Sequence, residues 1–191
     1  MIERIKNDLK QYYKNDVTRL SHIYGVKDTA LKLGKLYGAD LTKLTLASYL
    51  HDITKHYPTK THIDILKANQ KAHIINDFTP PLYHAYTASI IAKEHYNIKD
   101  TDILSAIESH TVGKPNMSLL EKILFISDFI EPHRLYPSCV IVREIAFNDL
   151  DLAVFKAIDL SITLYEKKHE TIPIIAYQAL AYYTPKKEIN L

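Results

Sequence analysis

Apolar residues recur three and four positions apart along almost the whole of this 191-residue chain, without a convincing two-residue alternation. Spacings of three and four place side chains on one face of a helix, whereas alternation would indicate strands. Glycine, which weakens helices, occurs only four times. The pattern therefore predicts an all-α protein. Because no internal repeat, low-complexity stretch or linker interrupts it, we expect a single helical domain over residues 1–191.

Capping residues and prolines set the boundaries of the expected helices. Asp16 can cap the first of these helices, and Gly38 can end it. Proline is tolerated at a helix start and cannot continue a helix that precedes it, so the prolines mark further boundaries. The expected helices cover residues 17–37, 41–55, 82–96, 100–110, 117–131, 140–147, 149–168 and 176–183.

The composition excludes several classes of protein. Lys plus Arg total 24 against 22 for Asp plus Glu, so the net charge of +2 predicts no nucleic-acid-coating surface. Cys139 is the only cysteine, which excludes intramolecular disulfides and cysteine-based zinc sites. The charged start has no apolar core like that of a signal peptide, and no apolar run approaches the ~18 residues of a membrane span. We expect a cytoplasmic protein with no nucleic-acid or membrane partner.

Five polar side chains occupy positions where the helical periodicity expects core residues. A single buried histidine is usually a core residue with a hydrogen-bond partner. A buried carboxylate, in contrast, needs a positive partner or a metal. One shared metal cluster would stabilise all five intrusions together. The five residues are His22, His51, His84, His110 and Asp128.

The adjacent pair His51 and Asp52 indicates where on its helix the metal site lies. Neighbours on a helix differ by about 100° in direction, so both can reach one ion only near a helix end. Their position shortly before Pro58 fits such an end. Imidazole and carboxylate ligands favour iron, manganese or zinc, and without thiolates we favour a six-coordinate site for iron or manganese.

The ordered set of a lone His, a His-Asp pair, further histidines and a late Asp resembles the HD-domain phosphohydrolases. The resemblance covers nearly the whole chain and is greatest to the branch that hydrolyses diadenosine tetraphosphate symmetrically to two ADP. It implies an HD-type helical bundle with the metal site in its centre, a core at about 17–135, and C-terminal helices that complete a nucleotide pocket. The similar stretches are RLSH at 19–22, LHDITK at 50–55, HTVGKPNM at 110–117 and DFIEPHR at 128–134.

The resemblance also implies roles for individual residues. The metal, typically iron with manganese as a substitute, would be held by His22, His51, Asp52 and Asp128. One or two ions would bind, and His84 and His110 would either complete a second metal site or donate hydrogen bonds to phosphate. Residues expected to contact the substrate are Arg19, His22, His84, His110, Thr111, Asp128, Arg134, Thr171, Ile172 and Pro173.

Two residues are candidates for a direct part in catalysis. Asp52 can bridge metals or orient the nucleophile, since His51 already supplies a ligand. Lys55 lies four residues after His51 and can reach phosphate, or it can remain a solvated lysine at a helix end. Arg19, three residues before His22, shares its helix face and can bind phosphate beside the metal.

The chain departs from the family pattern in two places. Residues 85–88 read AYTA where the family usually has glycines. Residues 172–175 read IPII where the family has a histidine or aromatic residue, a proline and then Asp-Thr. The second stretch is expected to contact the base or ribose, so it affects the substrate more than the metal.

Three alternatives remain open from the sequence. The same site could act on another mono-, cyclic or polyphosphate nucleotide, or the chain could be a catalytically weak nucleotide sensor. A purely structural helical protein is the third. The oligomeric state is not determined, and a homodimer remains open. We interpret five further histidines as surface residues: His56, His62, His73, His95 and His169.

Overall fold

The computed structural model describes residues 1–185, which form eleven α-helices and one short 3-10 helix, with no strand among them. This confirms the predicted all-α class. The elements are α1 (Ile2–Tyr12), α2 (Val17–Tyr37), α3 (Leu41–Leu50), α4 (Thr59–Ala68), α5 (Ile74–Asp77), η1 (Pro80–Leu82), α6 (Tyr83–Glu94), α7 (Thr101–Ser109), α8 (Leu119–Ile130), α9 (Pro137–Ala146), α10 (Leu150–Lys167) and α11 (Ile174–Tyr183).

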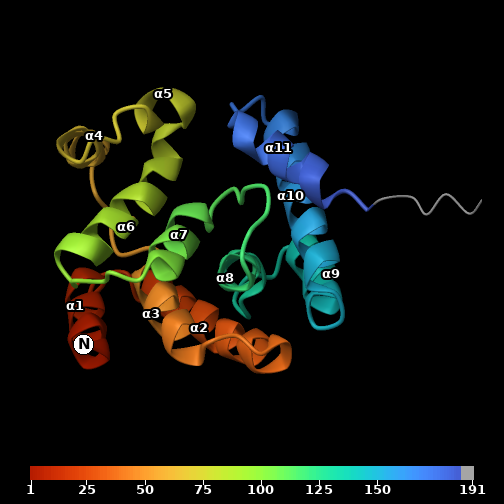
Figure 1. Cartoon of the computed structure of the whole chain (residues 1–191), viewed down its shortest axis with the longest axis horizontal. Helices are drawn as coiled ribbons and strands as arrows, with labels where there is room; N and C mark the ends of the chain where they lie inside the picture. The colour runs from red at the N-terminus through yellow and green to blue at the C-terminus, as the bar shows by residue number, and fades with distance from the viewer. Residues whose placement is uncertain (186–191) are drawn as a thin grey trace, which may run out of the picture.

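Helices α2, α3, α7 and α8 pack against one another and contribute many of the fully buried side chains (Figure 1). On one side α6 packs on α7, and α4 packs on α6. On the other side α9 and α10 pack on α8, and α11 packs on α10. Most of the functional groups described below lie in α2, α3, α7 and α8 or in the segments that directly follow these four helices, and His84 lies in α6.

Helix α2 has the boundaries that its capping residues predict. The Asp16 carboxylate accepts a hydrogen bond from the backbone N–H of Arg19 at 2.8 Å, as an N-cap does. Gly38 ends the helix in the left-handed conformation, with φ of 75°, which glycine adopts without a steric penalty. Apart from the helix expected at 41–55, the other predicted boundaries differ from the observed ones by at most three residues.

The helix expected over residues 41–55 is shorter than predicted, because α3 ends at Leu50. The chain then continues in tight turns, in which the N–H of Lys55 bonds the carbonyl of Asp52 at 2.8 Å. His51 and Asp52 therefore stand at the point where the regular helix stops. This confirms the expected helix end near the His-Asp pair, and it lets both side chains reach the same space.

Three helices were not predicted: α1, α4 and α5. In α1 only Ile5 and Leu9 are buried, and charged residues cover much of the remaining surface, so packing on α3 stabilises this short helix. Helix α5 has four residues, which is too short for a periodic pattern to reveal. In the part of the chain that the structure describes, no helix is long and apolar enough to cross a membrane.

Candidate metal centre

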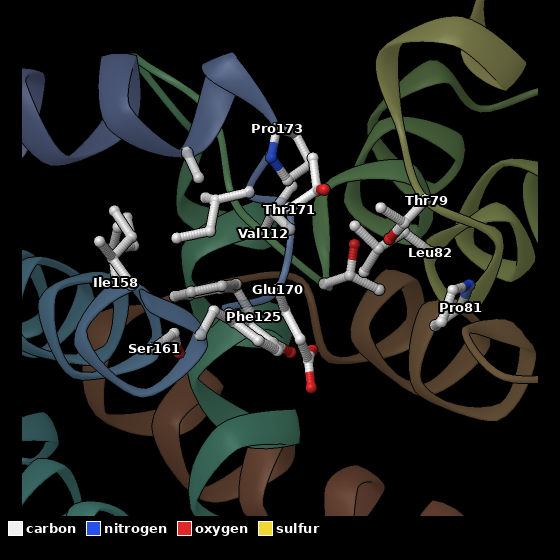
Figure 2. A pocket seen from close by; sticks show the side chains of 15 residues that line it. Thr79, Pro81, Leu82, Val112, Phe125, Ile158, Ser161, Glu170, Thr171 and Pro173 are labelled. Carbon is white, nitrogen blue, oxygen red and sulfur yellow. The ribbon is translucent and has the colours of Figure 1, made fainter. Parts of the chain in front are cut away.

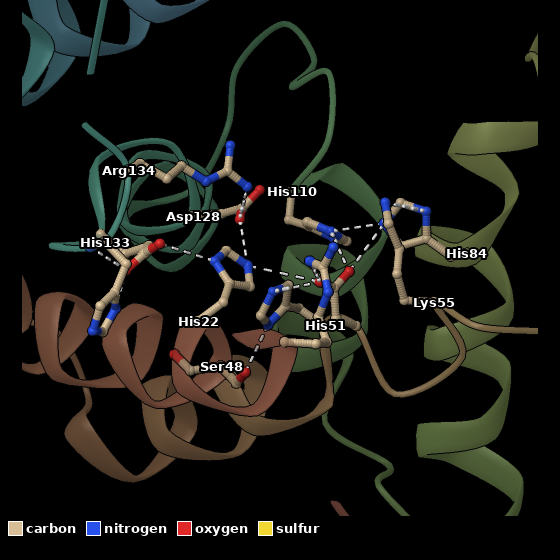
Figure 3. Close-up of polar contacts among 12 residues, drawn as sticks. His22, Ser48, His51, Lys55, His84, His110, Asp128, His133 and Arg134 are labelled. Carbon is tan, nitrogen blue, oxygen red and sulfur yellow. Dashed lines mark hydrogen bonds and ion pairs between the residues drawn. The ribbon is translucent and has the colours of Figure 1, made fainter. Parts of the chain in front are cut away.

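The Asp52 carboxylate lies among four imidazole rings, and Figure 3 shows these rings converging from separate helices. Its Oδ2 atom is 3.7 Å from Nε2 of His22 and 3.5 Å from Nε2 of His51. Its Oδ1 atom is 3.2 Å from Nε2 of His84 and 3.7 Å from Nε2 of His110. Two groups of potential metal ligands, each with two histidines, therefore share Asp52.

All four rings are oriented by an oxygen that faces their Nδ1 atom. An Nδ1–H that donates to this oxygen leaves Nε2 as the unprotonated atom that faces Asp52, which is the tautomer that binds a metal. In three rings the oxygen is a backbone carbonyl: Nδ1 of His51 lies 2.7 Å from Ser48, Nδ1 of His84 lies 2.8 Å from Pro81, and Nδ1 of His110 lies 2.7 Å from Ile107. In the fourth ring, Nδ1 of His22 lies 3.2 Å from Oε1 of Glu131.

Asp128 extends the cluster beyond His22. Its Oδ1 atom lies 3.1 Å from Nε2 of His22 and accepts a hydrogen bond from Nη2 of Arg134 at 2.8 Å. Burial opposes ionisation of this carboxyl group, but Arg134 and His22 outweigh it and hold the pKa of Asp128 well below its usual range. The group is thus an anion that faces the cleft.

The donor set fits a divalent metal ion. Nε2 of His22 and Nε2 of His51 are buried, and neither makes a hydrogen bond within residues 1–185. Buried polar atoms without partners are costly, and a shared ion would satisfy both. The surrounding donors are imidazole nitrogens and carboxylate oxygens, the set that suits iron, manganese or zinc.

At neutral pH, Asp52 and His84 are in the charge states in which these side chains bind a metal. Burial raises the cost of ionising Asp52, but His51 and the other rings outweigh it and hold the pKa of Asp52 well below its usual range. Burial lowers the pKa of His84 to about 4, so this ring is neutral at pH 7. Burial also lowers the pKa of Lys55, whose Nζ lies 3.3 Å from Nε2 of His84.

Two arginines flank the cluster. Nη1 of Arg19 donates to Oδ2 of Asp52 at 2.7 Å, while Arg134 pairs with Asp128. Nε of Arg19 is buried and has no hydrogen-bond partner in the described chain, so it remains a donor for an anionic ligand. Each of the two carboxylates in the site is thus paired with a guanidinium group, which also suits phosphate.

A cleft of about 620 Å³ opens onto the cluster. Its lining brings together most of the predicted site residues from helices that are distant in the sequence. The Thr111 hydroxyl, on the same wall, is buried and makes no hydrogen bond within the described residues. The predicted residues that line the cleft are Arg19, Asp52, Lys55, His84, His110, Thr111, Asp128 and Arg134.

A smaller pocket of about 110 Å³ (Figure 2) adjoins this cleft, and the two share the lining residues Pro81, Leu82, Thr111, Phe125, Ser161 and Tyr165. Thr171, Ile172 and Pro173 line this pocket and do not line the cleft beside the metal ligands. Apolar side chains from α8, α10 and α11 form much of the remaining wall: Phe125, Ile158, Ile162 and Ala176. The predicted C-terminal stretch therefore belongs to a separate, largely apolar part of the site.

Sequence reasoning missed Glu131, which is 2% exposed and lies beside His22. Its second oxygen accepts a hydrogen bond from the backbone N–H of His133 at 2.8 Å. Gly25 makes room for this carboxylate, because a Cβ at that position would lie 2.6 Å from Oε2 of Glu131. Glu131 directly follows the last residue of α8 and has a non-helical backbone, so the spacing along α8 gave no signal for its contact with His22.

A second missed residue is Tyr13 at the end of α1. Its hydroxyl is directed at the backbone of the His-Asp turn, where it donates to the carbonyl of Asp52 at 2.6 Å. The ring is 2% exposed, so this bond lies in the hydrophobic core. Tyr13 thus holds the backbone of Asp52 in place through this hydrogen bond.

The interpretation of His62 as a surface residue is wrong. Its side chain is buried, with 4% exposed, and Nδ1 lies 2.8 Å from Oγ1 of Thr87. Oγ1 of Thr87 also lies 2.8 Å from Oγ1 of Thr54, and Thr54 is two residues after Asp52 in the sequence. Helix α4, which was not predicted, buries this ring. The other four histidines interpreted as surface residues are exposed, as expected: His56, His73, His95 and His169.

Residues 19–132 match the model of the HD domain. This chain belongs to the HD-domain family. A protein of Halalkalibacterium halodurans named "Bis(5'-nucleosyl)-tetraphosphatase, symmetrical" is 39% identical to it over 81% of this chain and 82% of the relative. A Bacillus subtilis protein of the same name is 35% identical over 81% of this chain and 83% of its own length.

A solved structure is also similar over nearly the whole fold. It is the crystal structure of a predicted HD superfamily hydrolase involved in NAD metabolism from Clostridium acetobutylicum. The two chains share 33% identity and a TM-score of 0.89, with 96% of each chain covered. The HD-type bundle with the His and Asp cluster at its centre, expected from the sequence, is thereby confirmed.

Proposed function

We propose that this chain is a metal-dependent phosphohydrolase that cleaves diadenosine tetraphosphate symmetrically to two ADP, acting in the cytoplasm. The observation that carries the proposal is the sharing of the Asp52 carboxylate by two pairs of imidazoles at the wall of a cationic cleft. The names of the similar bacterial proteins support the choice of substrate. The single HD domain proposed here spans residues 1–191, with α10 and α11 completing the nucleotide pocket.

The proposed metal ligands are His22, His51, Asp52 and Asp128. Asp52, His84 and His110 would hold a second ion or, without one, His84 and His110 would donate hydrogen bonds to phosphate. We propose iron, with manganese as a substitute, because the donors are nitrogen and oxygen atoms without a thiolate. When bound, the metal polarises a phosphoryl oxygen and lowers the pKa of a coordinated water.

The protein side chains position and neutralise the substrate. Asp52 orients the nucleophile, because its two oxygens face both pairs of rings. Arg19, which pairs with Asp52, and Arg134, which pairs with Asp128, neutralise the charge of phosphate oxygens that bind beside these carboxylates. Lys55, close to His84 and largely withdrawn from solvent, donates to a phosphate oxygen in a region where water screens charge poorly.

The adjoining apolar pocket would receive one adenine (Figure 2). A flat base fits a site whose walls are mainly apolar, with a few polar groups to fix its orientation. Thr111 and Thr171 supply such hydroxyl groups, and Ile172 and Pro173 supply apolar contact. Of the stretch at 172–175, where the chain departs from the family pattern, Ile172 and Pro173 line this pocket, whereas Ile174 and Ile175 do not.

Product identification tests the proposal. Purified, metal-loaded protein incubated with diadenosine tetraphosphate should yield ADP alone, and elemental analysis should detect iron or manganese. Asp52→Ala and His51→Ala should each lose activity and metal while remaining folded by circular dichroism. Asp64→Ala, at an exposed carboxylate of α4, is the matched control and should keep both. Formation of ATP and AMP would refute symmetrical cleavage, and full activity of Asp52→Ala would refute the site.

A further inference from the structure

A second cavity, of about 720 Å³, opens on the cluster next to His22. It shares Arg19, Arg134 and Tyr136 with the cleft described above, but it contains neither Lys55 nor His84. In Figure 3, His133 and Arg134 lie at one end of the cluster, and Lys55 and His84 lie at the other. A chain of phosphates that passes the metal ligands can therefore leave the cleft and enter this second cavity.

The proposed reaction needs such a second space. In-line displacement places the attacking oxygen and the leaving group on opposite sides of the phosphorus atom. When water attacks one of the two central phosphorus atoms of a dinucleoside tetraphosphate and the bond to the central bridging oxygen breaks, each product is a complete nucleoside diphosphate. The pocket lined by Thr171 to Pro173 accounts for one nucleoside, and the other must bind elsewhere.

The second cavity carries groups that recognise a nucleoside diphosphate. Arg19 and Arg134 supply guanidinium groups on the wall that the two cavities share. Beyond them Tyr136 is 68% exposed, and a large exposed aromatic side chain of this kind offers a face on which a base can stack. Thr18 adds a hydroxyl group, and the carboxylate of Asp16 is engaged by His56 at 3.1 Å.

The loop that carries Arg134 and Tyr136, between α8 and α9, is held in position. Nη2 of Arg143, in α9, donates to the carbonyl of Glu131 and to the carbonyl of Arg134, both at 3.0 Å. Its Nε donates to the carbonyl of Ile130 at 2.9 Å. Tyr136 is the N-cap residue of the same helix. The exposed ring therefore stands on fixed backbone, which reduces the entropy lost when a ligand binds.

We propose that this second cavity binds the leaving nucleoside diphosphate half of the substrate, with its adenine stacked on Tyr136 and its phosphates against Arg19 and Arg134. This inference rests on the proposed function. It explains how one site can select a dinucleotide: Tyr136 contacts the second nucleoside, which a mononucleoside polyphosphate lacks.

Kinetics with two ligands test the inference. The KM for diadenosine tetraphosphate and the inhibition constant of adenosine 5′-tetraphosphate, which lacks the second adenosine, are measured for each variant. Tyr136→Ala should raise the KM about tenfold, as expected for a lost base–aromatic contact, and leave the inhibition constant unchanged. Tyr136→Phe should resemble the wild type because it keeps the ring. Tyr12→Ala, at an exposed tyrosine of α1, is the control.

Two results would overturn the inference. One is an unchanged KM in Tyr136→Ala, and the other is a parallel rise of the KM and the inhibition constant, which would indicate a general disturbance of the site. A wild-type protein that releases no ADP from the dinucleotide would instead contradict the proposed function itself, so the two failures are distinguishable.

Discussion

Oε1 of Glu131 lies 3.2 Å from Nδ1 of His22, whose Nε2 in turn lies 3.1 Å from Oδ1 of Asp128. The three other rings of the cluster are oriented by backbone carbonyls, so His22 is the one that depends on a replaceable side chain. A carboxylate behind a metal-binding histidine fixes the ring and increases its basicity. We expect Glu131→Gln to weaken metal binding about 10- to 100-fold. Competition with a chelator measures the affinity.

Glu144→Gln is the matched control for this variant, because Glu144 is exposed on α9. It should bind metal as the wild type does. An unaltered metal affinity in Glu131→Gln would show that the backbone alone orients His22, contrary to the role assigned to Glu131.

Lys55 offers a test of phosphate binding that leaves the metal ligands intact. Its Nζ lies beside His84 in the cleft, where burial lowers the pKa of the ammonium group. We expect Lys55→Met to lower kcat about 100-fold, the usual effect of removing one donor from a charge-stabilising site, with metal content unchanged. Lys60→Met, at an exposed lysine of α4, should have wild-type kcat. A Lys55→Met variant with normal kcat would mean that Lys55 is only a structural neighbour of the site.

Tyr13 tests how α1 supports the central carboxylate. Its hydroxyl donates to the carbonyl of Asp52 at 2.6 Å in the core. Tyr13→Phe leaves this carbonyl with the N–H of Lys55 as its remaining donor, so the free energy of unfolding should fall by about 0.5–1.5 kcal/mol. Urea denaturation measures the change, and Tyr12→Phe, at the exposed neighbouring tyrosine, should leave stability unaltered. Equal stability of the Tyr13 and Tyr12 variants would contradict this role.

His62 makes the stability of the protein depend on pH. Burial, with a smaller contribution from Lys55, lowers the pKa of this ring below its ordinary value near 6.5. Just below pH 6.5 the unfolded chain therefore binds more protons than the folded one, and the free energy of unfolding falls as the pH decreases. In metal-free protein, His62→Gln should reduce the loss of stability between pH 7 and pH 5. A variant with the same slope as the wild type would contradict the assignment.

The sequence predicted the central cluster because its members violate the apolar faces of their own helices. His22, His51, His84, His110 and Asp128 could each be identified from spacing within one helix, and the structure brings all five together. The end of α3 beside Asp52 could also be predicted, because the neighbouring side chains of His51 and Asp52 can reach one metal ion only near a helix end. The helix bounds were accurate where Asp16 and Gly38 supply caps.

What could not be predicted depends on contacts between distant segments. Tyr13 follows α1 and His62 lies in α4, two helices that were not expected, and their partners are 39 and 25 residues away along the chain. Glu131 was hidden for a different reason, because its contact with His22 requires the space that Gly25 leaves. Local periodicity contains no information on such pairs, since packing between helices creates them.

The most direct test of the account is hydrolysis of diadenosine tetraphosphate by the metal-loaded protein in water enriched in ¹⁸O, followed by mass spectrometry of the products. Attack on one of the two central phosphorus atoms, with cleavage of its bond to the central bridging oxygen, predicts ADP as the sole nucleotide, with one ¹⁸O atom on the terminal phosphate of half of the ADP molecules. Labelled AMP with unlabelled ATP, or labelled ATP with unlabelled AMP, would place the attack at an outer phosphate bond and contradict symmetrical cleavage at the Asp52 cluster.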